Sequence, residues 1–209
     1  MARVLVARVL VAPLGLRFLS LISCPMKQLS MDELQRPALE EYKSSEKMPV
    51  VIVLDNIRSG LNVGAIFRTC DAFSVEAIYL CGITVKPPHT EILKTALGAT
   101  SSVTWFYHQT TKEALQTLAS KGYNLMPVEQ TDRSIHLEQM DMIAHFPLAL
   151  IFGNEMRGVD AEVLSMCTTS LEIPQDGIKH SLNVATTAGI VIWECYRQCL
   201  LRKNFSLIE

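Results

Sequence analysis

The chain is short of positive charge. It carries 19 Lys and Arg against 21 Asp and Glu, for a net charge of −2. This balance argues against a protein that coats nucleic acid through bulk positive charge, so any contact with nucleic acid must be local. Charged residues make up 19% of the chain and apolar residues 49%, which excludes an intrinsically disordered protein. The 209 residues therefore predict a small folded protein with an ample core.

Motifs of several common sites are also missing. The six cysteines form no C-x-x-C pair and show no Cys/His spacing typical of zinc, so we expect no metal. Cysteines of this kind favour a reduced compartment, and we expect a cytoplasmic protein. The chain has no dinucleotide fingerprint G-x-G-x-x-G, no phosphate-binding G-x-x-x-x-G-K-[ST] and no G-x-S-x-G. The commonest nucleotide-binding and serine-hydrolase patterns are therefore excluded.

Residues 1–25 contain arginines but no acidic residue, so the rest of the chain holds 16 basic and 21 acidic side chains. Two of the arginines interrupt the apolar stretch, and the uncharged run Val9–Leu16 is far shorter than the roughly 20 residues that span a bilayer. We therefore expect no membrane segment. The stretch fits an organelle transit peptide, a secretory signal, or a start codon assigned too early, with Met26 or Met31 as the true start.

We expect residues 1–25 to be a leader outside the core, residues 26–48 a polar lead-in, and residues 49–209 the main domain. Short apolar runs within that domain predict strands at 50–54, 77–81, 103–107, 123–128, 148–152 and 171–174. Helical spacing predicts helices at 62–73, 90–97, 111–121 and 181–203. This alternation predicts an α/β fold with a mainly parallel sheet flanked by helices.

Ligands of parallel α/β sheets bind beyond the carboxyl ends of the strands. Three polar segments stand at such places, residues 55–62, 153–158 and 174–183. In the first, Asn62 stands at the predicted start of a helix, and Arg68 lies almost two turns further on. Each also has a structural interpretation: Asn62 as an N-cap, and Arg68 as a partly buried cation paired with a neighbour such as Asp71.

In the second segment, Gly153 and Gly158 bracket Glu155 and Arg157, which suits a close approach of the backbone to a ligand. The alternative is an ordinary turn with a surface salt bridge. The third segment is the densest polar loop of the chain, and its Ser181 could cap the last helix. Free N–H groups in the first turn of that helix would offer donors to an electron-rich ligand.

Together the three segments resemble the SpoU/TrmH family of RNA ribose methyltransferases, within the SPOUT superfamily. The resemblance covers residues 50–202. Its motifs stand as Asn62-Val63-Gly64-Ala65-Ile66-Phe67-Arg68-Thr69, then Phe152-Gly153-Asn154-Glu155 with Gly158, then Ile173-Pro174 with Ser181-Leu182-Asn183-Val184. The resemblance implies a C-terminal trefoil knot, an exception to the rule that chains avoid knots. It also implies a homodimer that shares its active sites, and S-adenosylmethionine as the cofactor.

Carried over position by position, the resemblance assigns three residues to the cofactor and five to catalysis. The cofactor residues are Gly153, Ile173 and Leu182, and the catalytic residues are Asn62, Arg68, Glu155, Ser181 and Asn183. The implied reaction is an in-line attack of a ribose 2′-hydroxyl of tRNA or rRNA on the methyl carbon of a sulfonium. A guanidinium is hard to deprotonate, so we expect Arg68 to bind an RNA phosphate and to stabilise the developing alkoxide.

Two alternatives stay open from the sequence. A related SPOUT enzyme could methylate a base nitrogen with the same cofactor. A dimer without catalytic activity could bind RNA or cofactor as a scaffold. The pairs Asn62/Arg68 and Ser181/Asn183 favour a ribose acceptor, and the presence of Asn62, Arg68 and Asn183 favours an active enzyme.

Overall fold

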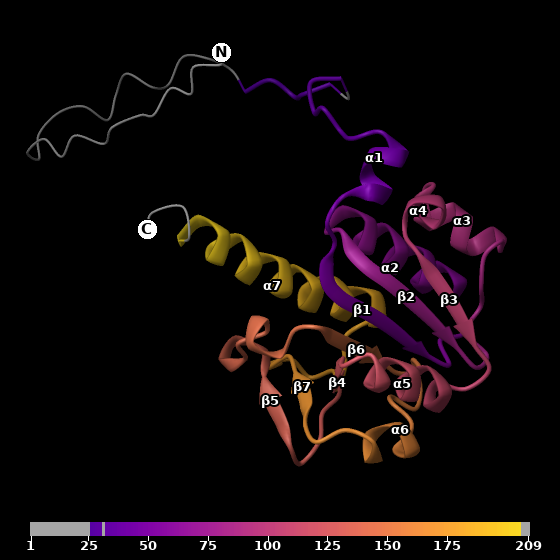
Figure 1. Cartoon of the computed structure of the whole chain (residues 1–209). Coiled ribbons are helices and arrows are strands. Elements are labelled where there is room, and N and C mark those ends of the chain that lie inside the picture. Colours follow the sequence, from indigo (N-terminus) through magenta and orange to yellow (C-terminus); the bar gives the residue numbers. More distant parts are fainter. Residues whose placement is uncertain (1–25, 31, 206–209) are drawn as a thin grey trace, which may run out of the picture. The chain divides into compact units, whose positions relative to one another are not determined.

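The computed structural model describes residues 26–30 and 32–205 (Figure 1). The leader predicted at residues 1–25 lies outside the described residues. The chain divides after Pro37 into two compact units. In the described part of the first unit, Ser30 and Glu33 form reciprocal hydrogen bonds, with Glu33 N to Ser30 Oγ at 3.3 Å. The predicted lead-in is therefore divided, because the second unit begins at Ala38 with the short helix α1 (Leu39–Ser44).

Five parallel strands form the central sheet of the second unit, in the order β3-β2-β1-β6-β4. Their bounds are Met48–Asp55 for β1, Val75–Cys81 for β2, Trp105–His108 for β3, Asn124–Pro127 for β4 and Leu148–Phe152 for β6. The adjacent strands β1 and β6 are buried almost throughout, because helices cover both faces of the sheet. The predicted parallel α/β sheet is thus confirmed.

Alternation along β1 divides the core into two layers. Val50, Ile52 and Leu54 face one cluster, and Val51 and Val53 face the other. The first cluster includes residues of α2 (Gly60–Ala72), α3 (Thr90–Ala96), α4 (Ala99–Ser102) and α7 (Val184–Phe205). The second includes residues of α5 (Thr111–Ser120) and α6 (Ala161–Ser165), on the opposite face of the sheet (Figure 1). Each apolar run therefore serves two helical layers at once.

The predicted strand at 171–174 is partly wrong. The strand β7 spans Ser170–Glu172 and pairs in parallel with β5 (Ser134–His136) in a separate two-stranded sheet. Pro174 cannot continue the ladder because it has no N–H group. Neither the three-residue β5 nor the short 3-10 helices Leu137–Gln139 and Ile143–His145 gives a periodic signal in the sequence.

Two helix starts also differ from the prediction. Helix α2 begins at Gly60, because Ser59 Oγ accepts a hydrogen bond from Asn62 N at 3.3 Å and caps the helix. Helix α7 begins at Val184 and not at Ser181. Its N-cap is Asn183, whose Oδ1 accepts hydrogen bonds from two backbone N–H groups in the first turn, Ala185 N at 2.9 Å and Thr186 N at 3.3 Å. The capping roles expected for Asn62 and Ser181 are therefore wrong.

None of the helices in the described part of the chain is long and apolar enough to cross a membrane. Within the same residues, no three His, Cys, Asp or Glu side chains gather as metal ligands.

Candidate functional site

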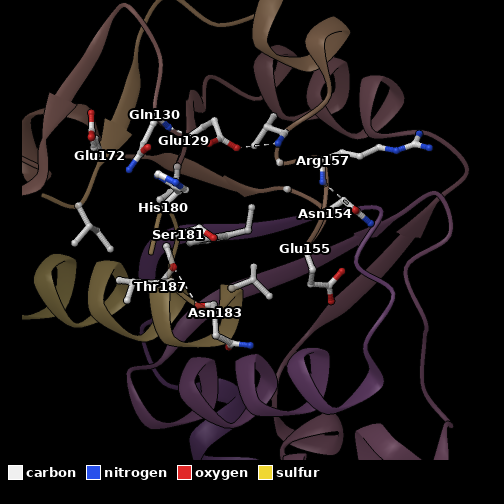
Figure 2. A pocket seen from close by; sticks show the side chains of 18 of the residues that line it. Glu129, Gln130, Asn154, Glu155, Arg157, Glu172, His180, Ser181, Asn183 and Thr187 are labelled. Atoms are coloured by element: carbon white, nitrogen blue, oxygen red, sulfur yellow. Dashed lines mark hydrogen bonds between the residues drawn. The ribbon is translucent and has the colours of Figure 1, made fainter. Parts of the chain in front are cut away.

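A cavity of about 650 Å³ lies at the carboxyl ends of β4, β6 and β7. Its walls come from residues within four stretches of chain, 128–130, 152–159, 171–175 and 180–187, and from Leu164. These include the second polar segment of the sequence and both ends of the third, and Figure 2 shows side chains from both around the cavity. A cavity therefore lies where the rule that ligands bind beyond the strand ends predicts a ligand site.

The loop after β6 is closed on itself. Asn154 N donates to Gly158 O and Gly158 N donates to Asn154 O, both at 2.9 Å. A Cβ on Gly153 would lie 2.1 Å from the carbonyl carbon of Gly158, and Gly158 has φ +70°. Both positions require glycine, the first for close backbone approach and the second for left-handed backbone. The closed loop presents Glu155 at its tip.

Glu155 binds the start of α2. Its carboxylate accepts hydrogen bonds from Arg58 N at 3.2 Å, Ser59 N at 3.1 Å and Asn62 Nδ2 at 3.1 Å. Partial burial raises the pKa of the Glu155 carboxyl, but the hydrogen bonds outweigh that effect and hold the pKa below its usual value. Glu155 is therefore ionised at neutral pH. No surface salt bridge involves Glu155 in the described residues, so that interpretation is wrong.

Asn62 joins Glu155 to Asn183. Because Ser59 caps α2, the side chain of Asn62 is free to interact beyond its own helix. Its Oδ1 accepts from Asn183 Nδ2 at 3.1 Å while its Nδ2 donates to Glu155. A carboxylate only accepts hydrogen bonds, so Glu155 fixes the orientation of the first amide and through it the second. One row of side chains thus connects all three polar segments.

The other predicted residues of the second and third segments line the same cavity. Gly153, Ile173 and Leu182, the residues expected at the cofactor, all belong to its wall. Ser181 also faces the cavity, and its hydroxyl forms no hydrogen bond within the described part of the chain (Figure 2). The site therefore gathers Glu155, Ser181 and Asn183 with the cofactor set, and Asn62 through its contact with Asn183.

Arg68 is not brought to this cavity. It is exposed on α2 and lines a separate hollow of about 530 Å³ together with Lys94 and other residues. The alternative pairing with Asp71 is wrong, because among the described residues Arg68 forms no ion pair, and Asp71 accepts instead from Ser102 Oγ. Six residues of helix separate Arg68 from Asn62 by about 9 Å along the axis and by a large rotation. A single chain therefore leaves Arg68 apart from the other four.

Two acidic residues were missed. Asp55 is buried at the end of β1 and accepts from Thr111 Oγ1 at 2.5 Å and from Asp160 N at 3.1 Å. Glu129 follows β4 and accepts from Val159 N at 3.1 Å, so both carboxylates hold the chain just after the closed loop. Their positions directly after strands were visible in the sequence, although their partners were not.

A comparison with protein-family models identifies the family of this chain. The model of the SpoU rRNA methylase family matches residues 49–193, which include all three polar segments. The chain belongs to the SpoU rRNA methylase family. The match ends within α7, so the whole lining of the cavity lies inside the family's domain.

Relatives in the family are named for RNA methylation. The tRNA (guanosine(18)-2′-O)-methyltransferase of Aquifex aeolicus is 28% identical over 166 residues, covering 77% of this chain and 74% of that protein. The enzyme of the same name from Thermus thermophilus is 28% identical over 168 residues, covering 80% of this chain and 84% of that protein.

Solved structures of the family have the same fold. The A. aeolicus TrmH/SpoU tRNA modifying enzyme superposes with a TM-score of 0.70 at 25% identity, covering 80% of this chain and 84% of that one. The AdoMet-bound rRNA methyltransferase of Sinorhizobium meliloti gives a TM-score of 0.67 at 25% identity, covering 75% of this chain. This chain spans 59% of the S. meliloti protein.

Proposed function

We propose that this protein transfers a methyl group from S-adenosylmethionine to a ribose 2′-hydroxyl of tRNA or rRNA. The observation that carries the proposal is the row Glu155–Asn62–Asn183 at the edge of a ligand-sized cavity. Membership of the SpoU family and the names of the A. aeolicus and T. thermophilus relatives support the same reaction.

The cavity fits the cofactor. Its volume of about 650 Å³ lies in the range of small-molecule sites. Gly153, Ile173 and Leu182 would hold the cofactor, with backbone groups for its polar edges and the two aliphatic side chains for its base. Bound there, S-adenosylmethionine supplies an activated methyl group on a sulfonium, so the protein has mainly to position and polarise the acceptor hydroxyl.

The asparagines can orient a ribose. Each side-chain amide has two N–H donors, and Asn62 and Asn183 each use one within the row. The second N–H of each amide remains for a hydroxyl oxygen of the substrate. Ser181, whose hydroxyl has no hydrogen bond to any other described residue, can accept the hydrogen bond of the acceptor hydroxyl. Fixed hydroxyl positions are what an in-line attack requires, and this supports a ribose acceptor over a base nitrogen.

A homodimer would complete the site. Arg68 lies outside the cavity of its own chain, exposed and without an ion pair in the described residues, so a second copy can supply it. Exposed apolar side chains on α2 and α7 support association of two copies. Leu61 on α2 is 42% exposed and Trp193 on α7 is 46% exposed. There Arg68 would bind an RNA phosphate and stabilise the developing alkoxide.

Three further elements belong to the proposal. Residues 49–209 form the methyltransferase domain, which the family match at 49–193 supports. The C-terminal part forms a trefoil knot, which the likeness to the A. aeolicus TrmH/SpoU structure supports. The protein acts in the cytoplasm, where tRNA and rRNA are available to it.

Incubation of the purified protein with labelled S-adenosylmethionine and total RNA tests the function. We expect label in one RNA size class, on nucleotides whose 3′ phosphodiester bond resists alkali, since a 2′-O-methyl group blocks the hydroxyl that cleaves it. Label on base atoms alone would replace the ribose acceptor with a base nitrogen. Cofactor binding without transfer to any RNA would identify a scaffold.

A further inference from the structure

Glu129 is a carboxylate of the cavity to which the proposed function gives no role. It follows β4, and its backbone is fixed because Glu129 N donates to Leu171 O at 3.0 Å, next to the bridge between Val128 and Leu171. The residue is half-buried and lines the same cavity as Gly153, and Figure 2 shows its side chain there. Its side chain therefore has a defined position in the cavity.

The hydrogen bonds of Glu129 leave part of its carboxylate free. Oε1 accepts from Gln130 N at 3.0 Å and Oε2 accepts from Val159 N at 3.1 Å. A Cβ on Gly158 would lie 2.3 Å from Oε2, so the glycine makes room for the carboxylate. Two carboxylate oxygens offer about four acceptor positions, and two remain. Within the described residues no cation pairs with Glu129.

The ligand that suits this group carries paired hydroxyls. Among the described residues no Lys, Arg or His pairs with Glu129, so its free acceptor positions suit a ligand that donates hydrogen bonds. A carboxylate at the carboxyl end of a parallel strand is a known acceptor for the ribose hydroxyls of a nucleoside cofactor. Two free positions match the two neighbouring hydroxyls of an adenosine ribose.

We propose that Glu129 accepts hydrogen bonds from the ribose hydroxyls of the bound cofactor and makes the site specific for a ribonucleoside. This inference rests on the proposed methyltransferase function. The hydrogen bond from Val159 N holds the carboxylate in place, and the same bond fixes the closed loop that presents Glu155. Glu129 would thus bind the cofactor directly, and it holds the loop by accepting a hydrogen bond from the backbone N–H of Val159.

Calorimetric titration with S-adenosylhomocysteine and its 2′-deoxy and 3′-deoxy analogues tests the inference without any methyl transfer. We expect the wild-type protein to bind at least one deoxy analogue about 10- to 100-fold more weakly, the usual range for a hydrogen bond to a charged group. In Glu129→Gln, affinity for the parent compound should fall by a similar factor, and the discrimination between the parent and the deoxy analogue should shrink to about threefold. Glu113→Gln on α5 is the matched control, because Glu113 is an exposed carboxylate outside the cavity lining; it should keep the full discrimination.

Three other outcomes would contradict the role of Glu129 or the proposed function. If Glu129→Gln weakens all three compounds by one factor, Glu129 only braces the loop and the inference fails while the proposed function stands. Equal wild-type affinity for the three compounds would overturn the inference without relying on the fold of any variant. A wild-type protein that binds no S-adenosylhomocysteine would overturn the proposed function as well.

Discussion

Asn183 Nδ2 donates a hydrogen bond to Asn62 Oδ1 at 3.1 Å, between residues 121 positions apart in the chain. The same Asn183 side chain caps α7 through its Oδ1. One amide therefore sets the start of the last helix and docks it against the first turn of α2. Because Asn62 also binds Glu155, the three motif segments form one hydrogen-bonded unit.

Replacing Asn62 with Ala should lower methyl transfer by about 100-fold or more, because the ribose loses an orienting donor and Asn183 loses its partner. Affinity for S-adenosylhomocysteine should stay within about threefold, since Asn62 is outside the cavity wall. Single-turnover assays and calorimetry measure the two effects. The control is Asn124→Ala at the start of β4, which should transfer methyl groups normally. An equal loss in both variants would mean that any surface asparagine matters.

Arg68→Ala should abolish methyl transfer and leave cofactor affinity nearly unchanged. If Arg68 acts on the site of a second copy, mixing Arg68→Ala with the inactive Asn183→Ala should restore about a quarter of wild-type activity. Half of the randomly formed dimers are then mixed, and each mixed dimer has one intact site. Refolded mixtures assayed against each pure variant measure this. Mixtures that stay inactive would place Arg68 in its own chain's site, and an active Arg68→Ala would exclude any catalytic role.

The hydrogen bonds to Glu155 predict a pH dependence of stability. A carboxyl whose pKa is lower in the folded protein stabilises the fold above its unfolded pKa, and this contribution is lost as pH falls through the folded pKa. The free energy of unfolding of wild type minus that of Glu155→Gln should therefore be constant from neutral pH down to about the ordinary value of 4.5, and should shrink below it. Urea unfolding at a series of pH values measures the difference. A difference that is unchanged through the acid range would mean that the folded protein leaves the pKa of Glu155 unshifted.

Gly158→Ala should destabilise the protein by about 1–3 kcal/mol, because φ at this residue is +70° and the added Cβ would collide with Glu129. The matched control is Gly177→Ala, where a Cβ meets nothing within 4 Å. It should change the free energy of unfolding by no more than about 0.5 kcal/mol. Thermal unfolding of the two variants compares them. Equal destabilisation would show that neither the backbone angle nor the contact matters.

Periodicity predicted most of the fold, and strand-end position predicted where the cavity lies. The buried runs at 50–54 and 148–152 became adjacent parallel strands, and their carboxyl ends carry two of the three polar segments. The pattern succeeds there because burial on both faces leaves a strong local signal in each strand. It failed for β5, which is three residues long and is held by pairing with β7.

The roles of individual polar side chains were less visible. From the sequence, Asn62 was a candidate cap of α2 and Ser181 a candidate cap of α7, because Asn and Ser are both good caps; the caps in the structure are Ser59 and Asn183. Asn183 caps α7 through Oδ1 and still donates to Asn62 through Nδ2. Glu129 was passed over because its partner Val159 is 30 residues away.

The sequence by itself determined the α/β alternation, the three polar segments and the resemblance to an RNA methyltransferase family, because these depend on local periodicity and short motifs. Only the tertiary structure decided that Glu155, Asn62 and Asn183 form one row, that Arg68 lies outside the cavity of its own chain, and that Glu129 lies inside it. Those relationships are hydrogen bonds and distances between residues far apart in the chain. The scarcity of positive charge fits this arrangement. A few groups around one cavity can bind an RNA substrate without an excess of positive charge over the whole protein.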